Sequence, residues 1–167
     1  MKIAFIYTSK TSNTEELVKI LHTLFLKQVS KVDLYRITEF PLGQLGKYDA
    51  IVIGTYTWGD GELPREMEPL YQAFEAMDQN QIITGVVGTG DRFYPNFCGA
   101  VDRFRDMLYV HTNLTVTLKV ELSPQLSDLY RCKRFVEIFV KKCHAQYRNG
   151  SESCVNTRRT IQANFGE

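Results

Sequence analysis

Hydroxyl and amide side chains gather in one short stretch near the start of the chain, which reads Ser9, Lys10, Thr11, Ser12, Asn13 and Thr14. The stretch follows an apolar run and opens into a segment with helical spacing at residues 15–27. The free N–H groups and the dipole of a helix start favour a bound anion. Because the loop lacks the glycine-rich forms that bind nucleoside triphosphates and dinucleotides, it suits a terminal phosphate monoester. A capped helix without a ligand is the alternative, since these residue types are also preferred N-caps.

A second loop with unusual content, residues 55–64, holds the only tryptophan of the chain, Trp58. Gly59 and Gly61 lie on either side of Asp60 and permit positive φ and a peptide that can turn over. A large aromatic ring at an exposed strand end is costly to leave in water, so Trp58 is expected to cover something flat. The alternative is a tight turn with Trp58 folded back onto the core.

A third loop, residues 88–102, offers a second aromatic ring at Tyr94. Asp91 and nearby backbone groups can hydrogen-bond the edge of a heterocycle. The alternative is an aromatic loop that plugs the end of the sheet. Taken together, a phosphate-binding loop and two aromatic rings predict a flat aromatic ligand with a phosphate tail. Flavin mononucleotide (FMN) has that shape.

Alternating strands and helices position these loops. Apolar runs rich in β-branched residues predict strands at 2–7, 32–35, 48–55, 82–88 and 114–121. Helical spacing predicts helices at 14–28, 65–77, 98–110 and 124–145, the last capped by Ser123-Pro124. This alternation predicts an α/β fold with a parallel sheet and helices on both faces. The three loops then lie at the carboxyl ends of strands, where such sheets bind ligands.

Length, composition and charge limit the number of domains, the location and the kinds of partner that the protein can have. The chain has 167 residues and a net charge of +1. This length fits one domain, expected at residues 1–147, before a polar and mobile tail at 148–167. The balanced charge predicts no nucleic-acid partner. No apolar run is long enough to span a bilayer and no signal-peptide pattern is present, so a cytoplasmic location without membrane contact is expected. The four cysteines match no zinc pattern and are expected to be reduced thiols.

All three loops resemble those of the flavodoxins, in the same order and at the corresponding strand ends. The sequence Ser9-x-Thr11-Ser12-Asn13-Thr14 is similar to the family's Ser/Thr-x-Thr-Gly-Asn-Thr phosphate loop. Thr57-Trp58-Gly59-Asp60 resembles the first flavin loop, and Gly90-Asp91, Tyr94 and Phe97-Cys98-Gly99-Ala100-Val101-Asp102 resemble the second. The resemblance covers residues 1–144 and points to the short-chain type. It implies a flavodoxin-like doubly wound sandwich, with a five-stranded parallel sheet in the order 2-1-3-4-5.

The resemblance also implies a role for each loop. The first loop holds the phosphate of FMN, and Trp58 and Tyr94 stack on opposite faces of the isoalloxazine. The Gly59 carbonyl accepts from N5–H of the reduced flavin, and Asp91 with adjacent backbone groups binds the pyrimidine edge. No catalytic or metal-binding residue is implied. The expected cofactor-binding residues are Ser9, Lys10, Thr11, Ser12, Asn13, Thr14, Thr57, Trp58, Gly59, Asp60, Gly90, Asp91, Tyr94, Phe97 and Cys98.

The function that the resemblance implies is a low-potential, FMN-dependent electron carrier without substrate turnover. It would be a monomer that passes single electrons, in transient complexes, from a reductase of the flavodoxin/ferredoxin type to acceptor enzymes. A dedicated activator of one enzyme, such as a ribonucleotide reductase, is the alternative within redox biology. A phosphoryl-accepting receiver would need an aspartate at the end of the third strand, where the chain has Thr55-Tyr56. An NAD(P)H-dependent flavin enzyme would need a second nucleotide fingerprint, and none is visible.

The chain departs from the flavodoxin pattern at two points. Ser12 replaces the usual glycine, which costs of order 1 kcal/mol if the position needs positive φ. Flavodoxins are typically strongly acidic, whereas residues 1–144 carry no net charge, so docking through an acidic face is called into question. Arg92 is expected to lie near the flavin edge, where its charge would raise the potential of the most reduced couple.

Overall fold

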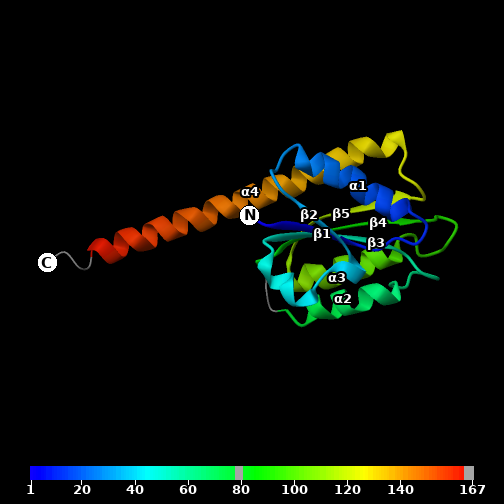
Figure 1. Ribbon diagram of the computed structural model, residues 1–167, viewed down its shortest axis with the longest axis horizontal. Coiled ribbons are helices and arrows are strands. Elements are labelled where there is room, and N and C mark those ends of the chain that lie inside the picture. The colour runs from blue at the N-terminus through cyan, green and yellow to red at the C-terminus, as the bar shows by residue number, and fades with distance from the viewer. Residues whose placement is uncertain (78–80, 164–167) are drawn as a thin grey trace.

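The computed structural model of the protein describes residues 1–77 and 81–163, with side chains up to residue 148. In this part of the chain, five strands form one sheet in which all neighbours are parallel, in the order β2-β1-β3-β4-β5 (Figure 1). The predicted fold class and strand order are confirmed. The strands are β1 (Ile3–Tyr7), β2 (Asp33–Arg36), β3 (Ala50–Tyr56), β4 (Ile83–Gly90) and β5 (Asn113–Glu121).

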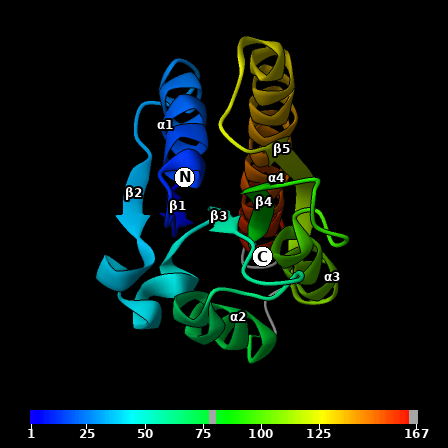
Figure 2. The same cartoon turned by 90° about the vertical axis from the view of Figure 1, so that its right-hand side faces the viewer.

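Helices cover both faces of the sheet, with α1 and α4 on one side and α2 and α3 on the other (Figure 2). Short 3-10 helices complete several of the connections. The α-helices are α1 (Asn13–Leu26), α2 (Glu68–Glu75), α3 (Gly99–His111) and α4 (Leu129–Ala163). The 3-10 helices are η1 (Ile37–Glu39), η2 (Leu42–Lys47), η3 (Arg65–Met67) and η4 (Leu126–Asp128).

Alternating side chains along β1 build a core on each face of the sheet. Phe5 packs edge-on against Phe25 of α1, with 5.1 Å between the ring centroids. Ile6 belongs to the opposite core, together with Phe74 of α2 and Phe104 of α3. All five side chains are 0% exposed. Full burial of one such side chain stabilises the fold by about 1.5–3 kcal/mol, so these two layers hold the sheet rigid beneath its loops.

Helix α4 begins later than predicted. The Ser123 hydroxyl, expected as its cap, donates to the Glu16 carboxylate instead, at 2.8 Å. A capping box between Gln125 and Asp128 starts η4, which leads into α4. The two side chains of this box satisfy the backbone N–H groups of Gln125 and Asp128 at this helix start.

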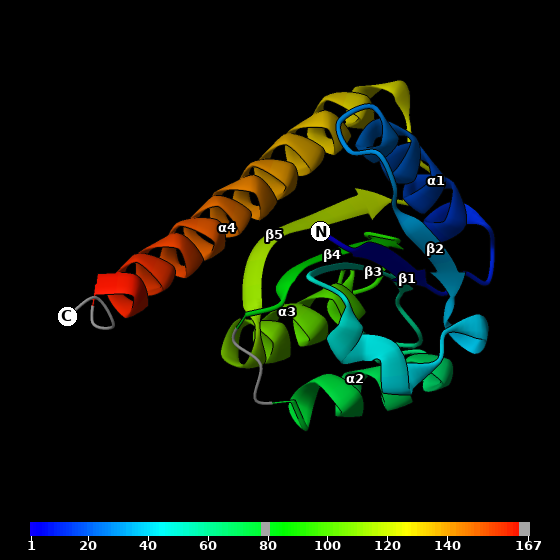
Figure 3. The same cartoon turned by 60° about the vertical axis from the view of Figure 1, so that its left-hand side comes forward.

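Helix α4 also runs past its predicted end near residue 145 and continues to Ala163 (Figure 3). No proline after residue 145 interrupts it. The predicted boundary between residues 147 and 148 therefore falls inside a helix. The mobility expected for residues 148–167 stays a prediction, and residues 164–167 lie outside the described residues. The inner stripe of α4 is buried at Cys132, Phe135, Val136, Phe139, Val140 and Cys143.

The helix predicted at residues 65–77 is divided into η3 and α2. Pro69 stands in the first turn of α2, where its missing N–H leaves no broken helix bond. Across the described ranges, no helix has the length and apolar character of a membrane span. In the same ranges, no three His, Cys, Asp or Glu side chains cluster in a way that could hold a metal ion.

Cys98, Cys132 and Cys143 are buried free thiols. Burial raises the pKa of Cys98 and of Cys143 to about 12, and that of Cys132 to about 11. All three therefore stay protonated and unreactive at neutral pH, because the thiolate is the nucleophilic form. The three are free thiols as predicted, and the side chain of Cys154, the fourth cysteine of the prediction, lies outside the described residues.

Candidate functional site

The three loops singled out in the sequence meet in one cleft of about 470 Å³ at the carboxyl ends of β1, β3 and β4. Most of the predicted site residues line it, among them Trp58 and Tyr94. Tyr56, Thr89, Asn96 and Leu122 line it as well and were not predicted. The lining residues are Lys10, Thr11, Asn13, Tyr56, Thr57, Trp58, Gly59, Thr89, Gly90, Asp91, Tyr94, Asn96, Cys98 and Leu122.

Ser9 and Thr14 lie deeper than the cleft lining. The Ser9 Oγ atom is buried and has no hydrogen-bond partner among the described residues. Thr14 is 1% exposed, and its hydroxyl is paired with that of Thr89 at 2.8 Å. The Thr14 side chain therefore joins α1 to the end of β4, which leaves its backbone N–H as its donor toward a ligand. The unpartnered Ser9 hydroxyl at the start of α1 suits a phosphate oxygen.

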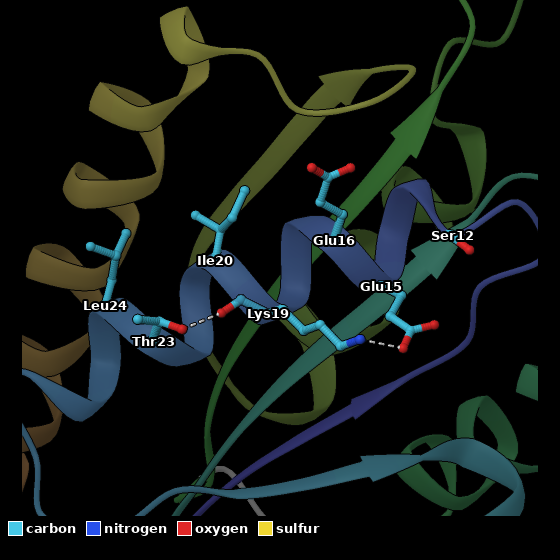
Figure 4. A pocket seen from close by; sticks show the side chains of 7 residues that line it. All are labelled: Ser12, Glu15, Glu16, Lys19, Ile20, Thr23 and Leu24. Carbon is cyan, nitrogen blue, oxygen red and sulfur yellow. Dashed lines mark hydrogen bonds and ion pairs between the residues drawn. The ribbon is translucent and has the colours of Figure 1, made fainter.

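Ser12 turns away from the cleft and lines a separate hollow along the outer side of α1, shown in Figure 4 with Glu15, Glu16 and Lys19. The carboxylate of Glu15 is engaged by Lys19 at 2.8 Å and by Arg36. This hollow is lined by α1 and its N-cap Ser12 alone, and its Glu15 carboxylate is already paired with Lys19 and Arg36. We therefore assign no ligand to it.

The backbone of Ser12 has φ of 67° and ψ of −13°, the left-handed conformation that glycine adopts without strain. Its carbonyl accepts from Glu16 N at 2.9 Å, which starts α1. Ser12 is therefore held in a strained left-handed conformation, as the sequence predicted for a serine at this position.

Replacing Ser12 with glycine is expected to raise the free energy of unfolding by about 0.5–1 kcal/mol, because relief of the left-handed strain exceeds the added entropy of the unfolded chain. Urea denaturation measures the change. The matched control is Ser30→Gly, at an exposed serine outside the positive-φ positions, where a loss of stability is expected. A Ser12→Gly protein that is no more stable than the parent would contradict the strain argument.

Trp58 pairs with Glu62 at the base of a tight turn. Its N–H donates to the Glu62 carbonyl at 3.0 Å, and its carbonyl accepts from Glu62 N at 2.8 Å. Gly59 and Gly61, inside the turn, have φ of 52° and 108°. The indole is 51% exposed, so it is not folded back on the core. It is available at the mouth of the cleft for a flat ligand.

Asn96 joins the second loop to the third. Its side-chain amide donates to the Asp60 carbonyl at 3.0 Å and to the Asp60 carboxylate at 3.2 Å. Thr57 makes a further link, because its hydroxyl accepts from Ala100 N at 3.3 Å. Asp60 is thus held at the side of the cleft rather than in its lining. No sequence signal marked Asn96, since an asparagine in a loop has many alternative partners.

The third loop presents two exposed aromatic rings. Tyr94 is 52% exposed and Phe93 is 87% exposed, and the rings meet edge to face with 5.9 Å between centroids. The Asp91 carboxylate accepts from Phe93 N at 2.8 Å, which fixes the turn that carries both rings. Phe97 is only partly buried and packs against the α2/α3 core instead of lining the cleft.

Arg92 does not lie where the sequence suggested. Its guanidinium faces the Glu121 carboxylate at 3.3 Å and the Phe97 ring at 5.3 Å, outside the cleft lining. An exposed carboxylate partner offsets its charge. The cation inside the cleft is Lys10, whose Nζ lies 4.0 Å from the centre of the Trp58 ring.

Glu66 lies next to the cleft and accepts from Thr8 Oγ1 at 2.7 Å and from Tyr56 OH at 3.1 Å. Burial alone would raise the pKa of its carboxyl. Hydrogen bonds from Thr8, from a backbone N–H and from Tyr56, with the charge of Lys10, hold that pKa below its usual value. Burial and the neighbouring Glu66 raise the pKa of Tyr56. At neutral pH Glu66 is therefore an anion and Tyr56 a neutral donor.

Residues 5–129 match the model of the flavodoxin family. The chain is 34% identical to probable flavodoxin 1 of Bacillus subtilis (strain 168) over 151 residues, which cover 89% of this chain and 94% of that relative. The chain belongs to the flavodoxin family. Flavodoxins bind FMN and transfer electrons without turning over a substrate, and this flavodoxin is of that kind.

Solved flavodoxin structures match the fold over nearly their whole length. A flavodoxin of Streptococcus pneumonia TIGR4 superposes with a TM-score of 0.79 at 34% identity and covers 85% of this chain and 99% of its own. A short-chain flavodoxin associated with a non-canonical PDU bacterial microcompartment superposes with a TM-score of 0.78 at 28% identity. The match covers 85% of this chain and 99% of that flavodoxin. The resemblance to short-chain flavodoxins seen in the sequence is thereby confirmed.

The cleft of this flavodoxin fits FMN at both ends. At one end, Thr11 and Asn13 line the cleft where the loop enters α1, whose amides favour a phosphate, and the Ser9 hydroxyl of the same loop is buried and unpartnered. At the other end, two half-exposed aromatic rings, Trp58 and Tyr94, line the same cleft and can cover a planar ring system.

Proposed function

We propose that this flavodoxin is a low-potential carrier that takes single electrons from a reductase of the flavodoxin/ferredoxin type and passes them to acceptor enzymes. The supporting observation is the pairing of half-exposed Trp58 and Tyr94 in one cleft with the unpartnered Ser9 hydroxyl. FMN, when bound, supplies the capacity to accept electrons one at a time. The protein supplies binding, orientation and local charge.

The residues that would hold FMN divide by position. Ser9, Thr11 and Asn13, with the N–H of Thr14, are proposed for the phosphate. Trp58 and Tyr94 are proposed to sandwich the isoalloxazine and to exclude water from its faces. Gly59, whose φ is positive, is proposed to present its carbonyl to N5. Gly90, Asp91 and the backbone of Cys98 are proposed for the pyrimidine edge.

Partner docking is proposed to rest on apolar contact at the mouth of the cleft, where Trp58, Phe93, Tyr94 and Leu122 are each at least half exposed. Two cations near the mouth, Arg92 and Lys119, are paired with carboxylates within the chain. Arg92 faces Glu121 at 3.3 Å, and Lys119 contacts Asp102 at 2.6 Å. An interface of this kind depends little on electrostatic steering. The complexes would be transient, formed by a monomer in the cytoplasm.

The test is electron transfer by the purified holoprotein. With a ferredoxin/flavodoxin reductase and NADPH, the protein should be reduced and should then pass electrons to an acceptor such as a haem protein. The protein with NADPH alone should not turn over. Absence of reductase-dependent transfer would contradict the carrier function, whereas turnover of NADPH by the protein alone would point to an enzyme.

A further inference from the structure

Lys10 belongs to the phosphate loop in sequence, yet its charge lies at the other end of the cleft. The side chain extends from the start of α1 to the Trp58 turn, where Nζ is 4.0 Å from the indole centroid. This separation is that of a cation–π contact. Lys10 also lines the cleft together with Tyr94 and Asp91. The ammonium is therefore next to the ring that stacks on the isoalloxazine.

The other cations of the neighbourhood are offset by carboxylates. Arg92 faces Glu121, Lys119 contacts Asp102, and Arg131 contacts Asp128 at 3.2 Å. Among the described residues, Lys10 has no carboxylate within 4.0 Å. The positive charge of Lys10 is consequently less neutralised by a neighbouring carboxylate than the charge of any of these three cations, so it acts more strongly on the cleft.

Four acidic residues also face this region. Asp91 lines the cleft, and Glu66 is an anion held by Thr8 and Tyr56. Asp60 is bonded to Asn96, and the Glu62 carboxylate lies against Gly59. These negative charges oppose any further negative charge on a bound ring. Lys10 is the one cation among the lining residues described here, so its removal leaves their repulsion unbalanced.

We propose that Lys10 serves the isoalloxazine and not the phosphate, and that it raises the potential of the second one-electron step. This inference rests on the proposed function. In that step one electron passes from the reductase to the flavin, no covalent bond forms or breaks, and Lys10 keeps its proton. The negative charge that the ring would acquire in this second step is stabilised by the ammonium over Trp58, while the ring before this step, after only one electron and still neutral, gains little.

The test compares Lys10→Met with Arg92→Met, because each removes one positive charge, one inside the cleft lining and one outside it. Redox titration of the holoproteins should show roughly a fivefold loss in relative stability of the fully reduced form in Lys10→Met. At 59 mV per tenfold for one electron, this is a fall of roughly 40 mV in the second potential. Arg92→Met should lower the second potential by less than Lys10→Met does. Lys10→Arg, which keeps the positive charge, should have a second potential close to that of the parent protein.

Two readouts separate the ring role from a phosphate role. Lys10→Met should weaken the binding of FMN and the binding of riboflavin, which lacks the phosphate, to the same small extent. In the apoprotein, loss of the cation should change the emission spectrum of Trp58, the only tryptophan. An unchanged second potential, a loss of affinity confined to FMN, or an unchanged emission spectrum would each overturn the inference. Failure of the parent protein to bind FMN would instead overturn the proposed function.

Discussion

Replacing Trp58 with alanine is expected to weaken the binding of oxidised FMN by about 30-fold. Stacking of a planar base on an aromatic side chain contributes about 1–3 kcal/mol, and 1.4 kcal/mol is a factor of ten in affinity. Trp58 is half exposed at the mouth of the cleft, so the ring has apolar surface that the flavin can cover. Trp58→Phe, which keeps a smaller aromatic ring, should lose less FMN affinity than Trp58→Ala.

Titration of the apoprotein with FMN, followed by quenching of flavin fluorescence, measures this change. The matched control is Tyr109→Ala, because Tyr109 is an aromatic residue of α3 that is 76% exposed and outside the cleft lining. It should leave FMN affinity unchanged. Thermal stability of the apoprotein should barely change in either variant, since neither ring is buried. An affinity within threefold of the parent in Trp58→Ala would contradict the stacking role.

A methyl group at Gly99 is expected to lower both stability and FMN affinity. A Cβ placed on Gly99 would lie 2.6 Å from Gly61 Cα and 2.9 Å from the Gly61 carbonyl oxygen. These are backbone atoms of the Trp58 turn, so the turn must move away from α3. Overpacking of this kind costs about 1–3 kcal/mol. Displacement of the turn would also move Trp58, with an expected loss of about tenfold in FMN affinity.

The control for Gly99→Ala is Gly43→Ala, since a Cβ at Gly43 would meet nothing within 4 Å. Urea denaturation and FMN titration should show a loss in the first variant and little change in the second. Helix propensity alone makes the opposite prediction, because alanine inside α3 would add about 1 kcal/mol relative to glycine. A more stable Gly99→Ala protein with unchanged FMN affinity would therefore show that the close contact is unimportant.

The sheet could be predicted from the sequence because β3 and β4 are nearly continuous apolar runs. Buried β3 coincides closely with the strand predicted at residues 48–55, and β4 coincides closely with the strand predicted at 82–88. The ends of α4 could not be predicted in this way. Ser123 resembles an N-cap in sequence, but its hydroxyl bonds Glu16, which is 107 residues away. A tertiary contact of this kind overrides a local capping signal.

The site could be predicted where the residue type itself carries the chemistry, as at Trp58 and Tyr94. It could not be predicted where the outcome depends on a distant partner. The Thr14 hydroxyl, a candidate phosphate donor in the sequence, is bonded to Thr89. Arg92, expected at the flavin edge, faces Glu121 instead. Both partners come from other strands, so only the folded chain reveals them.

Equilibrium binding of FMN to the apoprotein, read from the visible spectrum and from Trp58 emission, tests the central claim most directly. The claim is that the loops at Ser9–Thr14, Trp58 and Tyr94 form one FMN site. The account predicts saturable uptake of one FMN per chain, with shifted flavin absorption bands and quenching of the single tryptophan. A protein that stays colourless with added FMN, or that binds FMN with unchanged Trp58 emission, would contradict it.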